Sequence, residues 1–504
     1  MVEKSEPGSH PVGRPSAATA SPQDAPNGAQ TSPAATTEAA DAGDSDYAKH
    51  LKPRHLQMIA IGGSIGTGLF LSAGGRLAMG GPALAMVYAL CGLFAFFMIR
   101  ALGELTIHRP SSGAFVSYAR EFQGEGGAYA TGWLFFMDWA VTVMADISAI
   151  ALYVHFWSVF TPIPKWVLAL GALIVVFALN MLSVKVYGEM EFWFALVKVS
   201  AIVIFMIVAV VFVVTGHPVQ GEPAGFHQIT GNGGLFPEGF APMVTLALGV
   251  VFAFGGTEMV GIAAGEAESV REVIPKAVNS VMWRILLFYV GSIILLALVM
   301  PYTAYSANES PFVTFFEAIG VPHAGDIMNI VVMTAAASSL NAGLYSTGRT
   351  LRSLAMAGSA PKFATRMNKH QVPYGAISIT AALGLIGVMI NYIYPTDAFD
   401  IVMNLAGIGI AGTWMSIMIS HWIFVRRAHR GEVERPAYRL FAAPWTNLAT
   451  LIFLTLIILA MWLQDNVGKA TIITFICLAI IMTIAWFGWI RKRVNGEALE
   501  GMLE

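Results

Sequence analysis

Two glycine-rich segments interrupt long apolar stretches of the chain. The first reads Gly62-Gly63-Ser64-Ile65-Gly66-Thr67-Gly68, and the second reads Phe252-Ala253-Phe254-Gly255-Gly256-Thr257-Glu258. Unwinding a helix inside a bilayer frees backbone N–H and C=O groups, which must find partners or line a polar cavity. An amino acid offers both partners. Its carboxylate can accept hydrogen bonds from the N–H groups of Ser64, Ile65, Gly66, Thr67 and Gly68, and its ammonium can donate to carbonyls around Ala253, Phe254 and Gly255.

The two segments occupy matching positions in a weak internal repeat. At an offset of 190 residues, Gly66-Thr67 aligns with Gly256-Thr257. A repeat of five membrane spans is odd-numbered, so its second copy must be inverted in the membrane, and paired broken helices in inverted repeats are typical of secondary transporters. The alternative is that the glycines only allow close helix packing.

Ionisable residues within apolar stretches are further candidates, because such residues usually face a bundle interior. Lys198 should snorkel, pair or lose its proton. Asp146 could contact the bound molecule or carry a proton, whereas Asp138, about 80° away around the same helix, is as readily a structural hydrogen-bond partner. Glu258 could hold the second break open or take part in proton coupling. The rings of Phe252 and Phe254 could close over the site, although most aromatic residues in membrane helices only pack.

These residues require helices that cross a membrane. The chain has 504 residues, of which 56% are hydrophobic and 12% charged, about half the charged fraction of a soluble globular protein. Apolar runs of about 20 residues, each long enough to span the hydrocarbon layer, predict twelve transmembrane helices at 55–78, 82–103, 127–157, 165–183, 190–214, 241–265, 280–301, 324–346, 374–391, 397–425, 446–464 and 470–490.

The ends of the chain and its basic residues suggest an orientation. Residues 1–48 are rich in Ala, Ser, Thr, Pro, Gly and Asp, which predicts a disordered tail without the apolar region of a signal peptide. If the N-terminus is cytoplasmic, 25 of the 29 Lys and Arg residues lie on the cytoplasmic side. Of the other four, Arg76, Lys165 and Lys469 lie outside, and Lys198 lies within a span. Lys and Arg near span ends prefer the cytoplasmic side. Both termini are therefore expected to be cytoplasmic.

The opening stretch resembles a known superfamily. Leu51-Lys52-Pro53-Arg54-His55, followed by Gln57-Met58-Ile59-Ala60-Ile61 and the first glycine segment, is similar to the opening signature of bacterial amino-acid transporters of the amino acid-polyamine-organocation (APC) superfamily. The resemblance implies an all-α integral membrane protein with a LeuT-type 5+5 inverted repeat, discontinuous helices 1 and 6, and two peripheral helices. It places the ten-helix transport core at 49–425, the peripheral helices at 426–490 and a cytoplasmic tail at 491–504.

The resemblance also implies a mechanism. Proton-driven uptake is expected, without a cofactor, and Lys198 is expected to occupy the position at which sodium-coupled relatives hold an ion and to touch the unwound first span. Within the branch, His108-Arg109-Pro110-Ser111-Ser112-Gly113 and Ala336-Ala337-Ser338-Ser339-Leu340-Asn341 resemble L-asparagine permeases. Relatives that carry L-aspartate, or glycine with D-alanine and D-serine, leave these substrates open as alternatives.

A pocket for asparagine needs neutral donors and acceptors. Ser338 and Asn341 on the eighth span are the expected partners, with Ser339 and Asn404 also available; serines can instead bond to their own helix. Glu104 is expected to pair with nearby arginines in an inner gate, outside the site. We expect a monomer or homodimer in the bacterial plasma membrane that binds an amino acid and protons but no nucleic acid. An enzyme is not expected because the sequence shows no nucleophile and base, metal cluster or cofactor motif, and a sensor that binds without transport remains a weaker alternative.

Overall fold

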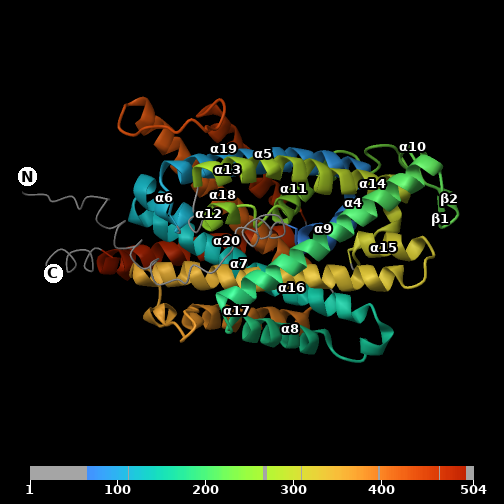
Figure 1. The fold of residues 1–504 in the computed structure, drawn as a ribbon, viewed down its shortest axis with the longest axis horizontal. Coiled ribbons are helices and arrows are strands. Elements are labelled where there is room, and N and C mark those ends of the chain that lie inside the picture. Colours follow the sequence, from blue (N-terminus) through green and yellow to red (C-terminus); the bar gives the residue numbers. More distant parts are fainter. Residues whose placement is uncertain are drawn as a thin grey trace, which may run out of the picture.

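The structure is a computed structural model that describes residues 65–111, 113–264, 270–307, 309–395, 398–464 and 466–494. Within these residues the chain is almost entirely helical, as expected. The strands are two residues long and pair antiparallel, with Pro218 opposite Pro223. Figure 1 shows α7 and α16 near the middle of the bundle, with α8 and α17 along one edge and α5 and α13 along the opposite edge.

The elements follow the chain in this order. The first part contains α3 (Thr67–Phe70), α4 (Ser72–Gly80), η2 (Gly81–Ala83), α5 (Leu84–His108), α6 (Ala114–Gln123), α7 (Glu125–His155), η3 (Ser158–Phe160), α8 (Lys165–Asn180) and α9 (Val184–Thr215). The middle contains β1 (Pro218–Val219), β2 (Glu222–Pro223), α10 (His227–Thr230), α11 (Ala241–Ala253), α12 (Met259–Ala264), α13 (Val270–Arg284), η4 (Ile285–Val290), α14 (Gly291–Val299), η5 (Tyr302–Ala304) and α15 (Pro311–Ala318). The last part contains α16 (Ala324–Met356), η6 (Lys362–Thr365), α17 (Tyr374–Ile393), α18 (Ala398–His429), α19 (Trp445–Ala460), η7 (Met461–Leu463), α20 (Asn466–Ala485) and η8 (Trp486–Ile490).

Among the described residues, nine helical stretches are long and apolar enough to cross a membrane, and Lys165–Asn180 and Ala241–Ala253 are shorter apolar helices. One stretch, Ser72–His108, combines part of the expected first span with the second. Gly81 divides it with a positive φ of 65°. The stretch is therefore not one straight helix, and the number twelve stays a prediction because the start of the expected first span lies outside the described residues.

The burial of the helices distinguishes the centre of the bundle from its lipid-facing surface. In α7, 89% of the most apolar window is buried, against 28% in α9 and 11% in α20. Gly409 on α18 lies so close to α7 that a Cβ added there would be 2.8 Å from the Cβ of Asp138. Small residues at such contacts let helices approach closely. Helix α7 is therefore the central helix, held tightly by α18.

The two glycine segments predict two helix breaks. Helix α11 ends at Ala253, and helix α12 begins at Met259, with Gly256 at a positive φ of 87° between them. In the first segment, Gly66 has an extended backbone, and helix α3 starts at Thr67. Helix α4 follows directly because Leu71 keeps right-handed backbone angles. The second interruption is confirmed. For the first, the structure describes the helix that follows the glycine segment, and the interruption itself stays a prediction because the residues before Ile65 lie outside the described part.

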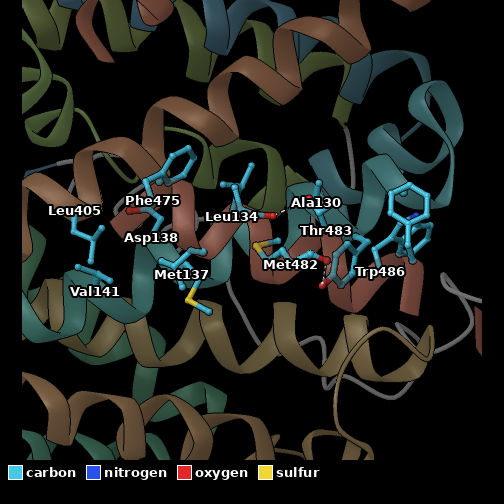
Figure 2. Close-up of a pocket in the computed structure, with 16 residues that line it drawn as sticks. Ala130, Leu134, Met137, Asp138, Val141, Leu405, Phe475, Met482, Thr483 and Trp486 are labelled. Carbon is cyan, nitrogen blue, oxygen red and sulfur yellow. Dashed lines mark hydrogen bonds between the residues drawn. The ribbon is translucent and has the colours of Figure 1, made fainter. Parts of the chain in front are cut away.

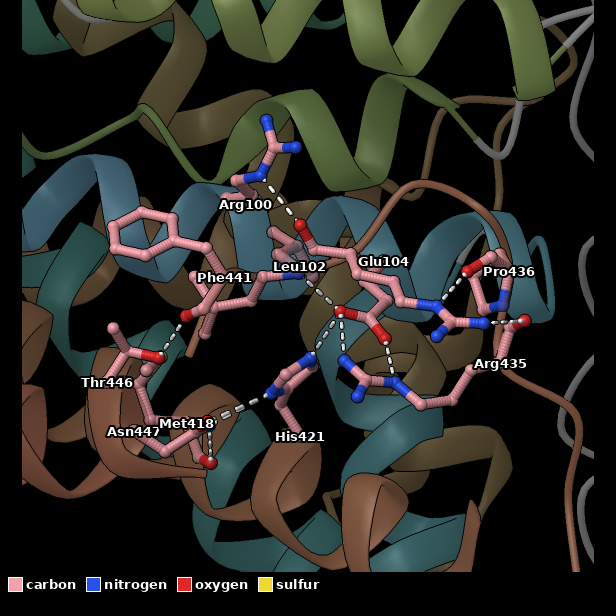
Figure 3. Close-up of polar contacts among 12 residues, drawn as sticks. Arg100, Leu102, Glu104, Met418, His421, Arg435, Pro436, Phe441, Thr446 and Asn447 are labelled. Carbon is pink, nitrogen blue, oxygen red and sulfur yellow. Dashed lines mark hydrogen bonds and ion pairs between the residues drawn. The ribbon is translucent and has the colours of Figure 1, made fainter. Parts of the chain in front are cut away.

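A buried carboxylate joins the transport core to the segment that precedes the peripheral helices. Glu104 on α5 is fully buried and accepts hydrogen bonds from His421 Nε2 at 3.0 Å, from Arg435 Nε at 2.7 Å and from the backbone N–H of Leu440 at 2.7 Å (Figure 3). The expected pairing of Glu104 with an arginine is confirmed. His421 extends the network to Asn447 on α19, with 2.9 Å between their Nδ1 and Nδ2 atoms.

Candidate functional site

The two helix breaks touch each other. A Cβ added to Gly68 would lie only 2.5 Å from the Cα of Ala253. Real side chains do not approach a backbone atom so closely, so the contact requires glycine at position 68. Two segments 185 residues apart in the sequence, Gly68 and Ala253, are thereby brought to one place.

A small cavity lies at this contact. Its volume is about 20 Å³, which is room for roughly one water molecule, so the surrounding helices are closed together. It is lined by Gly66, Thr67, Gly68, Asp138, Trp139, Thr142, Phe252, Ala253, Gly255, Gly256, Ser339 and Ile410. Five elements therefore contribute to its walls: the two breaks, α7, α16 and α18.

The cavity brings together six of the residues expected from sequence: Gly66, Thr67, Gly68, Phe252, Ala253 and Gly255. Ser64 lies outside the described residues. Ile65 is 1% exposed but does not line the cavity. The described residues of the two glycine segments therefore line one cavity, and their role in binding a substrate stays a prediction.

The expectation that the Phe254 ring closes over the site is wrong in this structure. The ring is fully buried and packs against Tyr88 and Tyr289, with centroid distances of 6.0 and 4.8 Å. The Phe254 carbonyl accepts a hydrogen bond from the Thr257 hydroxyl at 2.9 Å. The physical reason is the turn itself, because the break directs successive side chains to different sides, and only Phe252 remains at the cavity.

Asp146 does not line the cavity, contrary to expectation, but supports a residue that does. Thr67 Oγ1 donates to Asp146 Oδ1 over 2.9 Å, and the Asp146 side chain is fully buried. Asp138 lines the cavity instead, together with Thr142 one helical turn later. The spacing of four residues in Asp138-Trp139-Ala140-Val141-Thr142 is the sequence signal that could have identified this polar face.

Asp138 also borders a second cavity on the other side of α7. That cavity is predominantly apolar and lies between α7, α18 and α20, with Leu134, Leu405 and Phe475 among its walls (Figure 2). Only 11% of the most apolar window of α20 is buried. Asp138 therefore stands between the central cavity and a groove on the more exposed side of the bundle.

The residues on α16 differ from the sequence expectation by one position. Ser339 lines the cavity, whereas Ser338 and Asn341 do not. Successive residues turn by about 100° around a helix, so Ser338 faces α9 and Asn341 faces α8, where its side-chain oxygen accepts a hydrogen bond from Asn180 at 2.7 Å. The polar run was identified correctly, but its rotation relative to the cavity was not.

Comparison with known proteins agrees with this architecture. The family model described as "Amino acid permease" matches residues 55–496. The chain belongs to the amino acid permease family. It is 56% identical over 459 residues to an L-asparagine permease of Streptomyces coelicolor, covering 91% of this chain and 94% of the relative. It is 52% identical over 470 residues to an L-asparagine permease of Salmonella typhimurium (92% and 94% covered) and 52% identical over 454 residues to that of Escherichia coli K12 (90% and 91% covered).

In this permease, Lys198 belongs to a buried polar triad. Its ammonium donates to Ser338 Oγ at 3.0 Å and lies 3.8 Å from Glu191 Oε1, while Ser338 donates to the same Glu191 oxygen at 2.6 Å. Lys198 is 1% exposed, so it pairs rather than snorkels. Residues 61–64 of the unwound first span lie outside the described part of the chain. The expected contact of Lys198 with that span therefore stays a prediction.

Glu258 fixes the second break of the permease. Its Oε1 accepts a hydrogen bond from the N–H of Gly256 at 3.1 Å, and its Oε2 accepts one from Trp414 Nε1 on α18 at 3.3 Å. The side chain is 1% exposed. These bonds fit the structural role weighed for Glu258, that of holding the break, and both this role and proton coupling stay predictions.

The permease site is rich in carboxyl groups. In the described part of the chain, no group of three or more His, Cys, Asp and Glu side chains is arranged to hold a metal ion. Asp138 and Glu258 lie close enough for their charges to interact, as do Asp146 and Lys198. The arrangement offers hydrogen-bonding groups and ionisable side chains, which suit recognition of a polar solute.

Proposed function

We propose that this permease imports L-asparagine by proton symport through alternating access. The observation that carries the proposal is the contact of the two helix breaks at Gly68 and Ala253 beside a polar cavity. A pair of broken helices presents N–H groups on one side and carbonyls on the other, which complement the two charged ends of an α-amino acid. Relatives of about 50% identity are L-asparagine permeases, which supports asparagine as the substrate.

In the proposed complex, the substrate carboxylate accepts hydrogen bonds from N–H groups at Gly66, Thr67 and Gly68, at the start of α3. The first N–H groups of a helix have no partner within the helix and carry partial positive charge. The ammonium donates to carbonyls of the second break at Phe252 and Ala253. Because the cavity holds roughly one water in this closed form, α3 and α11 must separate for the substrate to enter.

Proton coupling is proposed for Lys198 and Glu258. Protonation of Glu258 would weaken its acceptance of the Gly256 N–H, since a carboxylate is a stronger acceptor than a carboxylic acid. Loss of a proton from Lys198 would weaken its attraction to Glu191. Glu258 acts on the break between α11 and α12, and Lys198 acts on the contact between α9 and α16. Protonation of either residue could therefore be linked to helix movement.

Purified protein in proteoliposomes tests transport. Radiolabelled asparagine should accumulate when an inward proton gradient is imposed and should not accumulate after addition of an uncoupler. Binding without accumulation would favour a sensor instead. Accumulation that persists unchanged with the uncoupler would contradict proton symport while leaving asparagine transport intact.

Competition in the same vesicles tests the substrate. Excess unlabelled asparagine should inhibit uptake at lower concentrations than aspartate, glycine, D-alanine, D-serine or glutamine. Low-concentration inhibition by aspartate without inhibition by asparagine would favour the aspartate alternative, and the same pattern for glycine and D-alanine would favour the small neutral substrates. Cross-linking in the bilayer would separate the proposed monomer from a homodimer.

A further inference from the structure

The central cavity has walls that the substrate backbone does not use. The two breaks account for the carboxylate and ammonium in the proposed function, on which this inference rests. The remaining lining residues are Asp138, Trp139 and Thr142 on α7, Ser339 on α16 and Ile410 on α18. The substrate side chain must therefore face these residues, and Asp138 is the charged one among them.

Asp138 and Thr142 form a matched pair of hydrogen-bonding groups. They lie one turn apart on α7, and their side chains are 3% and 8% exposed. Thr142 Oγ1 is 3.5 Å from Asp138 Oδ1, at the long limit of a hydrogen bond. This bond is weak, so both groups can exchange it for bonds to a ligand at little cost.

The backbone of α7 at Asp138 is held in place by a close contact with α18. The approach of Gly409 to the Cα and Cβ of Asp138 leaves α7 no room to shift toward α18. On the side of the second break, the Asp138 carboxyl group neighbours that of Glu258, which holds the break. A ligand group that enters the cavity therefore meets two neighbouring carboxyl groups.

We propose that Asp138 and Thr142 form the subsite that recognises the side-chain carboxamide of the substrate and excludes a side-chain carboxylate. The Asp138 carboxylate accepts from the amide NH₂, and the Thr142 hydroxyl donates to the amide oxygen. A carboxamide provides one donor and one acceptor group in this arrangement. The carboxylate of aspartate offers only acceptors and would bring a further negative charge to the neighbouring Asp138 and Glu258 carboxyl groups. Glycine or D-alanine would leave Asp138 and Thr142 with only their long bond to each other.

The test is the preference for asparagine over aspartate, measured as the ratio of the concentrations that half-inhibit uptake of labelled asparagine by full-length protein in proteoliposomes. Asp138→Asn removes the repulsion and supplies a donor for a carboxylate. We expect the ratio of the aspartate value to the asparagine value to fall at least tenfold. Glu125→Gln is the matched control, because it also replaces a carboxylate on α7 by its amide but lies at the start of the helix, away from the cavity wall, and it should shift this ratio less than threefold.

A second variant covers the case in which Asp138→Asn does not fold. Thr142→Val removes the hydroxyl but keeps the shape of the side chain, and should weaken asparagine two- to tenfold relative to alanine or glycine, which have no amide oxygen to lose. Protection from thermal unfolding by each amino acid in detergent gives the same ratios without transport.

The outcomes separate this inference from the proposed function. If wild-type protein takes up no asparagine, the proposed function fails. If wild-type protein prefers asparagine and the Asp138→Asn ratio shifts less than threefold, or shifts no more than in Glu125→Gln, the proposed function stands and Asp138 is not the amide-recognising residue. If Asp138→Asn does not fold and Thr142→Val leaves the preference for asparagine over alanine unchanged, the subsite is also wrong.

Discussion

Thr67 and Asp146 join the first break to the central helix of the bundle. The Thr67 hydroxyl lies at the start of α3 and donates to the buried Asp146 carboxylate over 2.9 Å. The backbone of the same threonine borders the cavity. The geometry of the proposed carboxylate site is therefore linked to α7 through one side-chain hydrogen bond.

Removing that hydroxyl should impair uptake. Thr67→Val leaves Asp146 Oδ1 buried without its donor, and an unpaired buried acceptor costs about 1–3 kcal/mol. We expect uptake of asparagine at subsaturating concentration to fall about tenfold or more. Thr67→Ser keeps the hydroxyl and should retain most of the activity, so equal losses in the two variants would contradict a role for this bond.

Adding one methyl group at the contact of the two breaks should abolish transport. The Cβ of Gly68→Ala would lie 2.5 Å from the Cα of Ala253, so the breaks must move apart. Overpacking of this kind costs about 1–3 kcal/mol. Gly171→Ala on α8 is the control, because its Cβ meets nothing within 4 Å, and it should transport normally. Normal uptake by Gly68→Ala would show that the closed contact is not needed.

Replacing the buried lysine should uncouple transport from the proton gradient. In Lys198→Ala, the cation beside Glu191 is lost, and substrate exchange across the membrane is expected to continue while accumulation no longer responds to an imposed pH gradient. Lys185→Ala, an exposed change on the same helix α9, should keep the response. Full pH-dependent accumulation by Lys198→Ala would remove Lys198 from the coupling mechanism.

One carboxyl group outside the spans should make stability depend on pH. Burial, and secondly the nearby Glu317 carboxylate, raise the pKa of Glu309 in the loop before α15 from 4.5 to about 7. The folded protein then holds this proton more tightly than the unfolded chain between about pH 4.5 and 7, so this contribution to stability is lost as the pH rises through that window.

Glu309→Gln is uncharged at every pH and should therefore lose less of its apparent melting temperature than the wild type between pH 5 and pH 8. Glu222→Gln, the same charge change at an exposed position of the β1–β2 hairpin, should follow the wild type. The idea fails if the Glu309→Gln and wild-type pH profiles run parallel.

Breaking the Glu104 network should destabilise the fold. Glu104→Gln leaves Arg435 without its counter-charge and weakens the acceptor of buried His421, and breaking a buried ion pair costs about 3–5 kcal/mol. The apparent melting temperature in detergent should fall by several degrees. Glu432→Gln alters an exposed, loosely paired carboxylate, with 3.7 Å to Arg430, and should change stability by about 0–1 kcal/mol. Equal effects would contradict the importance of burial at Glu104.

The sequence predicted features that depend on local composition. The helix breaks at Gly66 and Gly255-Gly256 follow from glycine runs in apolar stretches, and the pairing of Glu104 follows from burial of a charge. Helix rotation did not follow, because it is set by contacts between helices. Ser338 and Ser339 are adjacent in sequence but about 100° apart around α16, and only Ser339 lines the cavity.

The choice between Asp138 and Asp146 illustrates the same limit. Both are buried carboxyl groups on α7, and their spacing places them within about 80° of each other. The two residues differ in their position along α7 relative to the helix breaks, and only Asp138 packs against Gly409. Neither difference can be predicted from the sequence around the two aspartates. Thr142 and Trp139 were missed for the same reason.

The bonds of Glu104 also bear on how the chain is divided. The family resemblance predicts a boundary near residue 425 between a ten-helix core and two peripheral helices, yet Glu104 on α5 is held by Arg435 and Leu440 from beyond that boundary. Any swing of the second span must either carry the 430–444 segment with it or strip a buried anion of its donors. The segment before α19 is therefore bonded to α5, and a movement of either one is expected to be transmitted to the other.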